Sequence, residues 1–382
     1  MAVTTVQSNN KLVKYTQEIN REWCRENMFS PYMGEDLTSI FRRKNDLKNG
    51  GEQMNIPLVG RLTGAGVGAG TLVGNEEKID NYGMRVWLDW ARHAVVTNKA
   101  EQQKDSADIF GEAKPLLADW AKELQRDEII AALMALPYES SPANLGTSAG
   151  QRVNGILYDE ATAAQRNTWN SDNSDRVLYG AAVSNYNATH ATALANVDTT
   201  NDKLTAANLA LLKRVAMAAN PKIRPYKTKD GYEYYVAFAG TNTFRDLKSS
   251  LETVNKDGRP REGDGMKNNP LFQDGDQIYD GVIVRQVPEI SSFVTNVWTT
   301  MTTANSTGSR LEPVFLCGQQ AAAIAIGQMV KPTFRKEDDY GFITGTGVEM
   351  AYGVSKIFRK PNANSKLIQT GMATGFFASA TD

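Results

Sequence analysis

A glycine-rich segment near the start of the sequence has the spacing of a dinucleotide-binding loop. Residues 64–70 read Gly-Ala-Gly-Val-Gly-Ala-Gly, which matches the pattern G-x-G-x-x-A. In dinucleotide-binding enzymes such glycines let the backbone approach a pyrophosphate at the N-terminus of the following helix. An apolar stretch, 54–59, precedes the run, and Asp89 follows at about the distance of a ribose-binding carboxylate. The spacing therefore raises nucleotide binding as one interpretation.

The residues that follow the glycines do not predict the helix that a phosphate loop requires. A helix N-terminus offers free N–H groups and positive potential to the phosphates. Here Gly74 and Asn75 are poor residues for a helix interior, and Glu76 and Glu77 place negative charge where phosphate would bind. We therefore expect the glycine run to have a structural role.

A second pattern is typical of serine hydrolases. Residues 146–150 read Gly-Thr-Ser-Ala-Gly, and the G-x-S-x-G elbow places its serine, here Ser148, between a buried strand and a helix. The flanking residues are rich in Ser, Asn and Pro, and His190, the sole histidine downstream, follows a Thr-, Ala- and Asn-rich stretch. We expect a loop of small residues at this position.

A group of acidic residues resembles the start of a calcium-binding loop. Asp274, Asp276 and Asp280 have part of the EF-hand spacing, but Ile278 and Tyr279 occupy the positions that need an acid or amide and a glycine. A turn with solvated acids explains them better. The sequence therefore predicts no metal, no cofactor and no catalytic residue.

The segments on both sides of the glycine run alternate as strands do. Apolar residues recur at every second position, namely Met54, Ile56 and Leu58 before the run and Tyr82, Met84, Val86, Leu88 and Trp90 after it. Trp87 is expected on the opposite face of the same strand as Trp90, so both faces of the hairpin carry large apolar groups. Because a two-stranded arm is marginal in water by itself, we expect a neighbouring subunit to cover it.

The rest of the chain has a mixed order of helices and strands. A helix is predicted over 115–136, where Leu117, Trp120 and Leu124 form a stripe and Pro137 ends it. Further helices are expected at 205–219, at 246–254 and in an alanine-rich segment ending at 329, strands at 232–239, 281–284 and 314–317 and twice within 342–358, and extended surface loops with short strands over 139–202. An order without a repeated strand–helix unit favours an α+β fold.

Composition argues against a protein that depends on strong phosphate neutralisation. The 382 residues include 42 Lys and Arg against 43 Asp and Glu, so the net charge is close to zero. Cys24 and Cys317 have no metal-binding spacing, and we expect both to be reduced. The N-terminus lacks the apolar core of a signal peptide, and the most apolar stretch, 314–330, contains three glutamines. A membrane location is not expected.

This order of elements, with a polar arm, a glycine-tipped hairpin, a long helix and a mixed body, resembles the major capsid proteins of tailed bacteriophages. Among them the sequence is closer to the coat proteins related to that of the podovirus N-four. The segments that carry the resemblance are 58–64 (Leu-Val-Gly-Arg-Leu-Thr-Gly), 74–77 (Gly-Asn-Glu-Glu), 92–95 (Arg-His-Ala-Val), 117–120, 315–322 (Phe-Leu-Cys-Gly-Gln-Gln-Ala-Ala), 339–341 and 353–356.

The resemblance implies an α+β fold of the Hong Kong 97 type. Its parts would be an N-terminal arm (1–53), an E-loop hairpin arm (54–96), a peninsular domain with the spine helix and a long loop insertion (97–204), an axial domain (205–330), and C-terminal strands returning to the body (331–382). Copies would assemble in the host bacterial cytoplasm as hexamers and pentamers. These would close into the icosahedral head of a virion around double-stranded DNA.

The resemblance also implies partners and contact residues. The candidate intersubunit contacts are Arg61, Leu62, Gly64, Gly66, Gly68, Gly70, Leu72, Trp87 and Trp90. A portal and a separate scaffolding protein are expected partners, decoration proteins stay open, and packaged DNA would be bound without sequence specificity. The alternatives are an encapsulin-like nanocompartment shell of the same fold, and a nucleotide-binding or serine-hydrolase enzyme.

Overall fold

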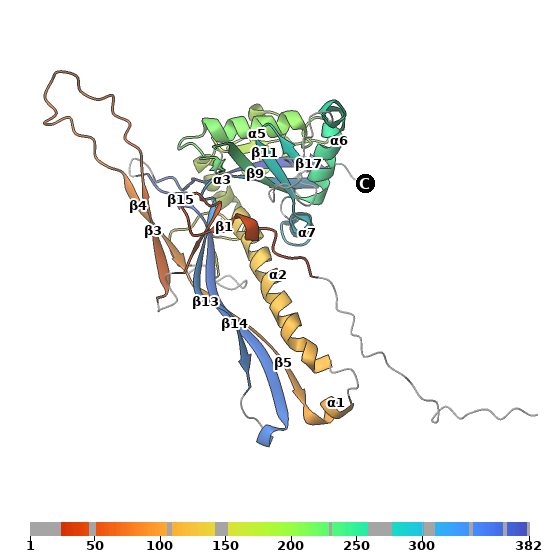
Figure 1. Ribbon diagram of the computed structural model, residues 1–382. Helices are drawn as coiled ribbons and strands as arrows, with labels where there is room; N and C mark the ends of the chain where they lie inside the picture. The colour runs from red at the N-terminus through yellow and green to blue at the C-terminus, as the bar shows by residue number, and fades with distance from the viewer. Residues whose placement is uncertain are drawn as a thin grey trace, which may run out of the picture.

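The protein has three visible parts (Figure 1). They are an elongated sheet beside a long helix, a rounded body at one end of that helix, and a projecting hairpin. The computed structural model describes residues 24–45, 51–104, 109–141, 152–228, 231–258, 277–299, 301, 310–335, 339–361 and 365–379. Ser148 and its flanking glycines lie outside the described residues, as do Asp274 and Asp276.

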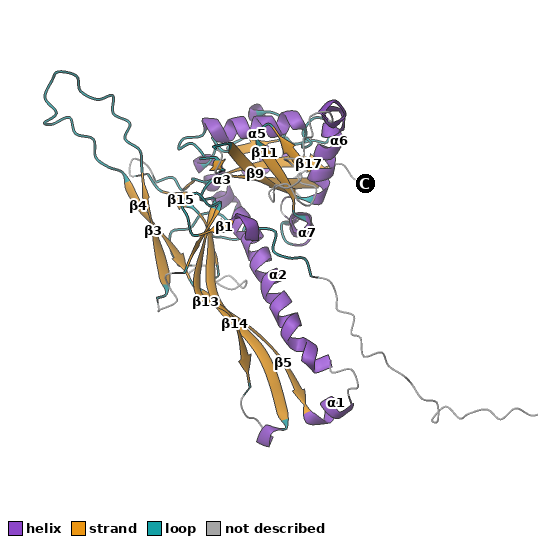
Figure 2. Cartoon of the chain, viewed as in Figure 1, coloured by secondary structure: helices purple, strands orange, loops and turns teal. Residues whose placement is uncertain are grey.

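The elongated sheet has the strand order β1-β2-β13-β14-β5, with β6 beside β14. Its strands are β1 (Met33–Gly34), β2 (Phe41–Lys44), β5 (Asp89–Asn98), β6 (Val153–Asn154), β13 (Ala322–Phe334) and β14 (Ile343–Lys356). Helix α2 (Ala113–Met134) lies along this sheet (Figure 2) and buries Leu117, Ala121, Ile130 and Leu133. The helix predicted over 115–136 is therefore confirmed, with both ends shifted by about two residues, the usual uncertainty of helix ends.

A second sheet forms the rounded body, in the order β10-β11-β9-β12-β17-β7, with β8 beside β9. Its strands are β7 (Val177–Tyr179), β8 (Tyr226–Lys227), β9 (Glu233–Ala239), β10 (Gln277–Tyr279), β11 (Val282–Gln286), β12 (Arg310–Cys317) and β17 (Met372–Ser379). One face packs on α5 (Ala206–Ala218) and α6 (Thr241–Gly258), and the other on α7 (Pro288–Asn296) and the segments around Phe29 and Trp169. Helices and strands predicted in this part, including the Thr205 cap of α5, are confirmed.

The prediction of surface loops over 139–202 is wrong for the described residues, whereas the short strands expected in that range are present as β6 and β7. Helices α3 (Ala163–Asp172) and α4 (His190–Ala195) pack into the main core. His190 is buried, with its Nε2 2.8 Å from the Tyr158 hydroxyl and its Nδ1 2.7 Å from that of Tyr179. Burial lowers the pKa of His190 to about 3. The low apolar content of residues 139–202 gave no sign of burial, because aromatic and histidine side chains joined by hydrogen bonds form the core of this region.

The alanine-rich helix predicted to end at 329 is also wrong, because this segment is strand β13. Ala323 and Ala325 face the hairpin, whereas Ala322, Ile324 and Ile326 face the main core. Small side chains on one face let the hairpin lie close, and β-branched isoleucines suit the other. Pairing with β2 and β14 on both sides thus overrides the helix propensity of alanine.

Short elements complete the chain. These are α1 (Lys99–Lys104), β15 (Phe358–Arg359), β16 (Ile368–Gln369) and the two hairpin strands β3 (Gln53–Val59) and β4 (Asn81–Trp87). The two strands predicted within 342–358 are β14 and the start of β15. The chain combines helices with several separate β-sheets, which confirms the α+β class.

Candidate intersubunit contact surface

Strands β3 and β4 with the connecting residues 60–80 form a hairpin arm that projects from the body (Figure 1). We call residues 60–80 the arm loop. The alternation predicted for both strands is confirmed: Met54, Ile56, Met84 and Val86 are buried on one face. They pack on the alanines of β13 and on the segment around Phe358. The chain itself therefore covers this face, contrary to the expectation that both faces lack cover.

The second strand of the arm ends earlier than the alternation predicted. β4 stops at Trp87, and after Leu88 the chain enters β5, which pairs with β14 in the elongated sheet. Trp90 therefore lies outside the arm and is 52% exposed, while Trp87 is partly buried at the base of the arm. Both strands keep a two-residue period, so the pattern could not reveal the change of partner.

Two contacts fix the chain where it passes from the arm into the sheet. Asn154 accepts from the Trp87 N–H at 2.8 Å and donates to the Trp87 carbonyl at 3.0 Å. On β14, a Cβ at Gly353 would lie 1.9 Å from the same Trp87 carbonyl oxygen. A glycine is thus required at 353 for the arm to leave the sheet at this point.

The predicted contact residues on the glycine-rich segment all lie in the arm loop. Arg61, Leu62, Gly64, Gly66, Gly68, Gly70 and Leu72 are all exposed. The most exposed large apolar side chains of the arm are Val59 (68%), Leu62 (61%), Leu72 (66%), Val73 (79%) and Ile79 (58%). Sequence reasoning missed Val59, Val73 and Ile79, although their apolar type beside a glycine run was a visible signal. We call these five exposed side chains the apolar strip of the arm.

Two of the predicted glycines have an identifiable reason to be glycine. Gly66 has a φ of +78°, a conformation that other residues resist. A Cβ at Gly64 would lie 2.9 Å from a Glu77 carboxylate oxygen. Gly68 has open space around it. The spacing that resembled a cofactor fingerprint therefore comes from unrelated local needs, and no helix follows it.

Glu77 holds the two sides of the arm loop together. Its carboxylate accepts from the backbone N–H of Thr63 at 2.7 Å, from that of Gly64 at 2.7 Å and from the Thr63 hydroxyl at 3.1 Å. The bonds from these backbone groups lower the pKa of Glu77. At the base of the loop, the Gly60 N–H bonds to the Asp80 carbonyl at 2.7 Å, and Arg359 bonds the Asp80 carboxylate.

Acid is expected to loosen the arm loop. Because the pKa of Glu77 is lower in the folded loop than its ordinary value of 4.5, its ordering effect is complete above pH 4.5 and is lost as pH falls through the lowered value. Hydrogen exchange at Thr63 and Gly64, measured by NMR, is expected to lose about tenfold protection there after correction for intrinsic rates. Glu77→Ala should show the loss already at pH 6. Unchanged exchange in that variant would contradict the role.

Within the ranges given above, no group of three or more His, Cys, Asp or Glu side chains could hold a metal ion. No described helix has the length and apolarity to cross a membrane. His93 lies on β5 against the ring of Trp120, at a centroid distance of 4.9 Å. Cys24 and Cys317 are both free thiols.

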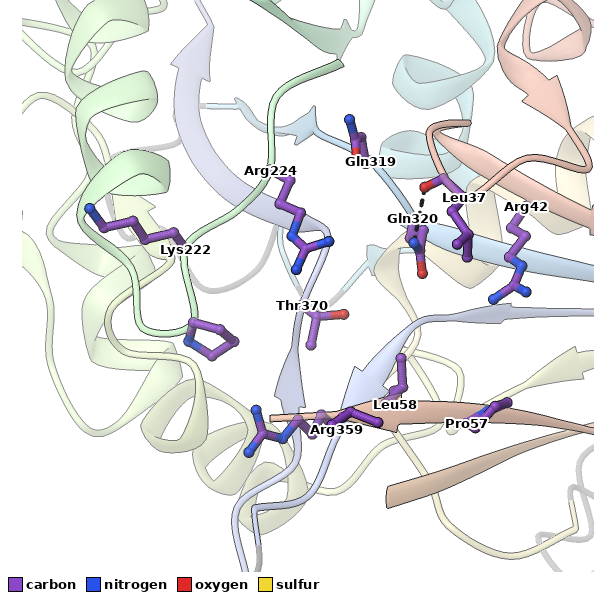
Figure 3. Close-up of a pocket in the computed structure, with 12 residues that line it drawn as sticks. Leu37, Arg42, Pro57, Leu58, Lys222, Arg224, Gln319, Gln320, Arg359 and Thr370 are labelled. Carbon is purple, nitrogen blue, oxygen red and sulfur yellow. Dashed lines mark hydrogen bonds between the residues drawn. The ribbon is translucent and has the colours of Figure 1, made fainter. Parts of the chain in front are cut away.

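A cavity of about 340 Å³ lies at the base of the arm, where β3 meets the segments around Leu37, Arg224 and Arg359 (Figure 3). Four cationic side chains line it: Arg42, Lys222, Arg224 and Arg359. Gln320 closes one side, since its Nε2 donates to the Leu37 carbonyl at 2.9 Å. Sequence reasoning did not find this cavity, because its residues come from five separate parts of the chain.

Comparisons with known proteins agree with one another. Residues 3–374 match the family described as phage capsid protein. Among solved structures, the chain is similar to the cyanophage Pam1 capsid asymmetric unit, at 33% identity and a TM-score of 0.84, covering 100% of both chains.

More distant structures share the fold. The capsid of Ralstonia phage GP4 is 17% identical with a TM-score of 0.70, over 100% of this chain and 99% of that one. The acidic stable capsid structure of Helicobacter pylori bacteriophage KHP30 is 13% identical with a TM-score of 0.68, over 97% and 96%. No curated protein sequence matches the chain.

Proposed function

Because this chain belongs to the phage capsid protein family, we propose that its copies assemble as hexamers and pentamers around double-stranded DNA. It is a structural protein with the Hong Kong 97-type fold, a major capsid protein that forms the icosahedral shell of a phage head. Its place is the virion. Assembly in the host cytoplasm, with a portal and a separate scaffolding protein, belongs to the proposal.

The apolar strip of the arm is the observation that carries the intersubunit part of this proposal. The strip runs from Val59 at the end of β3 into the arm loop, and the chain itself leaves all five of its side chains exposed. Exposed apolar patches of this kind mark surfaces that associate with a partner. The arm, including Arg61, Leu62, Leu72 and the glycines 64, 66, 68 and 70, would lie on the neighbouring subunit. Trp87 and Trp90 would contribute from the arm base and β5.

We propose the following division of the chain. Residues 1–53 are the N-terminal arm, whose strands β1 and β2 join the edge of the elongated sheet, and β3, β4 and the arm loop are the E-loop. The elongated sheet with α2 as spine helix is the peninsular domain. The second sheet with α5, α6 and α7 is the axial domain, to which β7 and β17 contribute strands from outside 205–330. The segment 322–330 goes with the peninsular sheet, because β13 pairs there.

Electron microscopy of the protein, expressed with and without the phage's scaffolding protein, tests the assembly. Closed shells built of hexamers and pentamers are the expected result. In particles from the native source, nuclease-protected double-stranded DNA is expected, whereas a protein cargo would favour the encapsulin-like alternative. Monomers alone under every condition would contradict the proposal.

A substitution in the apolar strip separates apolar burial from mere loop presence. Leu72→Asp is expected to lower the yield of shells by at least about tenfold, because the contact would lose a buried apolar side chain and a carboxylate would have to be desolvated in its place. Leu72→Met keeps the apolar volume and should assemble like the unaltered protein. Both variants should melt at the same temperature as monomers, since Leu72 contacts no core. Equal shell yields from both variants would argue against burial of this side chain.

A further inference from the structure

The cavity at the base of the arm has a strong imbalance of charge. Four cations line it, and no acidic side chain does. Arg359 is paired with Asp80. Within the described part of the chain, the side chains of Arg42, Lys222 and Arg224 make neither a hydrogen bond nor an ion pair, and the Nε of Arg42 is buried without a partner. Arg42 is partly buried, and a partly buried cation without a partner is unfavourable, so together with the two exposed cations beside it this arrangement suits an anionic ligand.

The shape and the remaining lining indicate what kind of anion fits. Leu37, Pro57, Leu58 and Val59 add apolar side chains to the lining. Figure 3 shows Arg224 and Arg42 on opposite sides of Gln320, with Leu58 and Pro57 below them. An inorganic anion would leave these apolar side chains exposed to water. A peptide segment that presents an acidic and an apolar side chain together matches both.

The arm loop contains a segment of this composition. Residues 72–76 read Leu-Val-Gly-Asn-Glu, and Leu72, Val73 and Glu76 are all exposed. Among the described residues, Glu76 accepts from the Gly74 N–H at 2.8 Å and from no other group, so its second carboxylate oxygen is free to accept. Val59 belongs both to the cavity lining and to the apolar strip of the arm, so the two surfaces are continuous.

We propose that residues 72–76 of one copy dock into the basic cavity of the neighbouring copy, with Glu76 against Arg42, Lys222 and Arg224. This inference rests on the proposed role of the arm and names its receptor. Donor and receptor are different surfaces of the same chain. Such a head-to-tail contact closes into a ring when the rotation between neighbours permits it, and a capsomer is a ring of this kind.

Charge reversal and its rescue test the pairing. Lys222→Glu with Arg224→Glu replaces two exposed cations and is expected to reduce shell yield at least about tenfold, because like charges would then face Glu76. Adding Glu76→Lys to the same chain should restore the yield to within about threefold of the unaltered protein. Arg214→Glu, an exposed site on α5 away from the cavity, is the charge control and should assemble normally. Thermal melting of each variant checks that the subunit is folded.

A cross-link gives a second readout that does not depend on yield. In shells, Glu76→Cys with Arg224→Cys is expected to form disulfide-linked multimers on a non-reducing gel, and neither single variant should. Normal yield from the reversed variant, failure of Glu76→Lys to restore it, or no cross-link would each overturn the docking. The docking would also be overturned if the charge-reversed variant assembled normally but no longer bound short duplex DNA. That result would assign the cavity to nucleic-acid phosphate. Absence of shells from the unaltered protein would instead overturn the proposed function itself.

Discussion

Deletion of residues 63–73 is expected to abolish closed shells while leaving a folded subunit. The deletion removes Leu72 and Val73 from the apolar strip, together with the glycine run. It breaks the contacts of Glu77 with Thr63 and Gly64, but no residue of the hydrophobic core is lost. Because Thr63 and Glu77 lie within hydrogen-bond distance, a shorter loop can still connect β3 to β4. The fold does not depend on this loop, whereas the contact between neighbours does.

The size of the effect follows from repetition. Every copy in a shell would lose the same contact, so even a modest loss per contact is multiplied around each ring. We expect the yield of shells to fall by at least about a hundredfold, while the melting temperature of the monomer changes by no more than about 4 °C. Negative-stain microscopy and sedimentation measure the first quantity, and circular dichroism the second.

Gly68→Ala is the matched control for the deletion. Gly68 lies in the middle of the removed segment but has open space around it and does not have a positive φ. Alanine should therefore be accepted, with normal assembly. If the deletion variant formed shells of ordinary number and stability, the arm loop would not be an assembly element.

Glu128→Ala is expected to destabilise the subunit by about 3–5 kcal/mol, the cost of leaving one partner of a buried ion pair alone. Glu128 lies on α2 and is 7% exposed. Its carboxylate accepts from Arg152 Nε at 2.8 Å and from the Tyr352 hydroxyl. Arg152 Nη1 in turn donates to the Trp90 carbonyl at 2.8 Å. The cluster therefore joins the spine helix to β14 and β5, close to the base of the arm.

Two substitutions bracket this prediction. Tyr352→Phe removes one hydrogen bond but leaves the ion pair, so we expect a loss of about 1 kcal/mol. Glu123→Ala lies on the same helix, where the Glu123 side chain is 47% exposed and 3.9 Å from Arg126. Arg126 itself is buried and keeps its ion pairs with Asp127 and Glu289, so the loss of this half-exposed carboxylate should cost under about 1 kcal/mol. Chemical denaturation of the three variants gives the free energies of unfolding, and similar losses for Glu128→Ala and Glu123→Ala would refute the buried role.

Local periodicity was sufficient to predict the arm, the spine helix and most of the body. Alternation at Met54, Ile56, Met84 and Val86 reports one buried face, and that face is buried in the structure. The same signal failed beyond Leu88, because a two-residue period shows that a segment is a strand and not which strand it pairs with. At β13 the alanines suggested a helix. Their small side chains are needed because the arm packs closely on that face of the sheet, and this packing cannot be seen in the local sequence.

The candidate contacts also include some that the sequence predicts and some that it does not. Residues of the arm loop could be found from the sequence, since a glycine run between two strands predicts an exposed turn. The basic cavity could not, because Arg42, Arg224 and Arg359 are far apart in the chain and each resembles an ordinary surface cation. Trp90 was placed on the arm because the sequence gives no sign that its strand belongs to another sheet.

The passage of β4 into β5 at Leu88 also makes the arm a mechanical element. Figure 1 shows the two strands running in the same general direction, so tension on the arm loop enters the elongated sheet along the axis of β5. The ten-residue strand β5 pairs with β14 along its whole length. Its hydrogen bonds therefore share the load in shear, instead of opening one after another as they would when peeled. A neighbouring subunit that held the arm loop would therefore load β5 in shear, the direction in which its hydrogen bonds to β14 resist together.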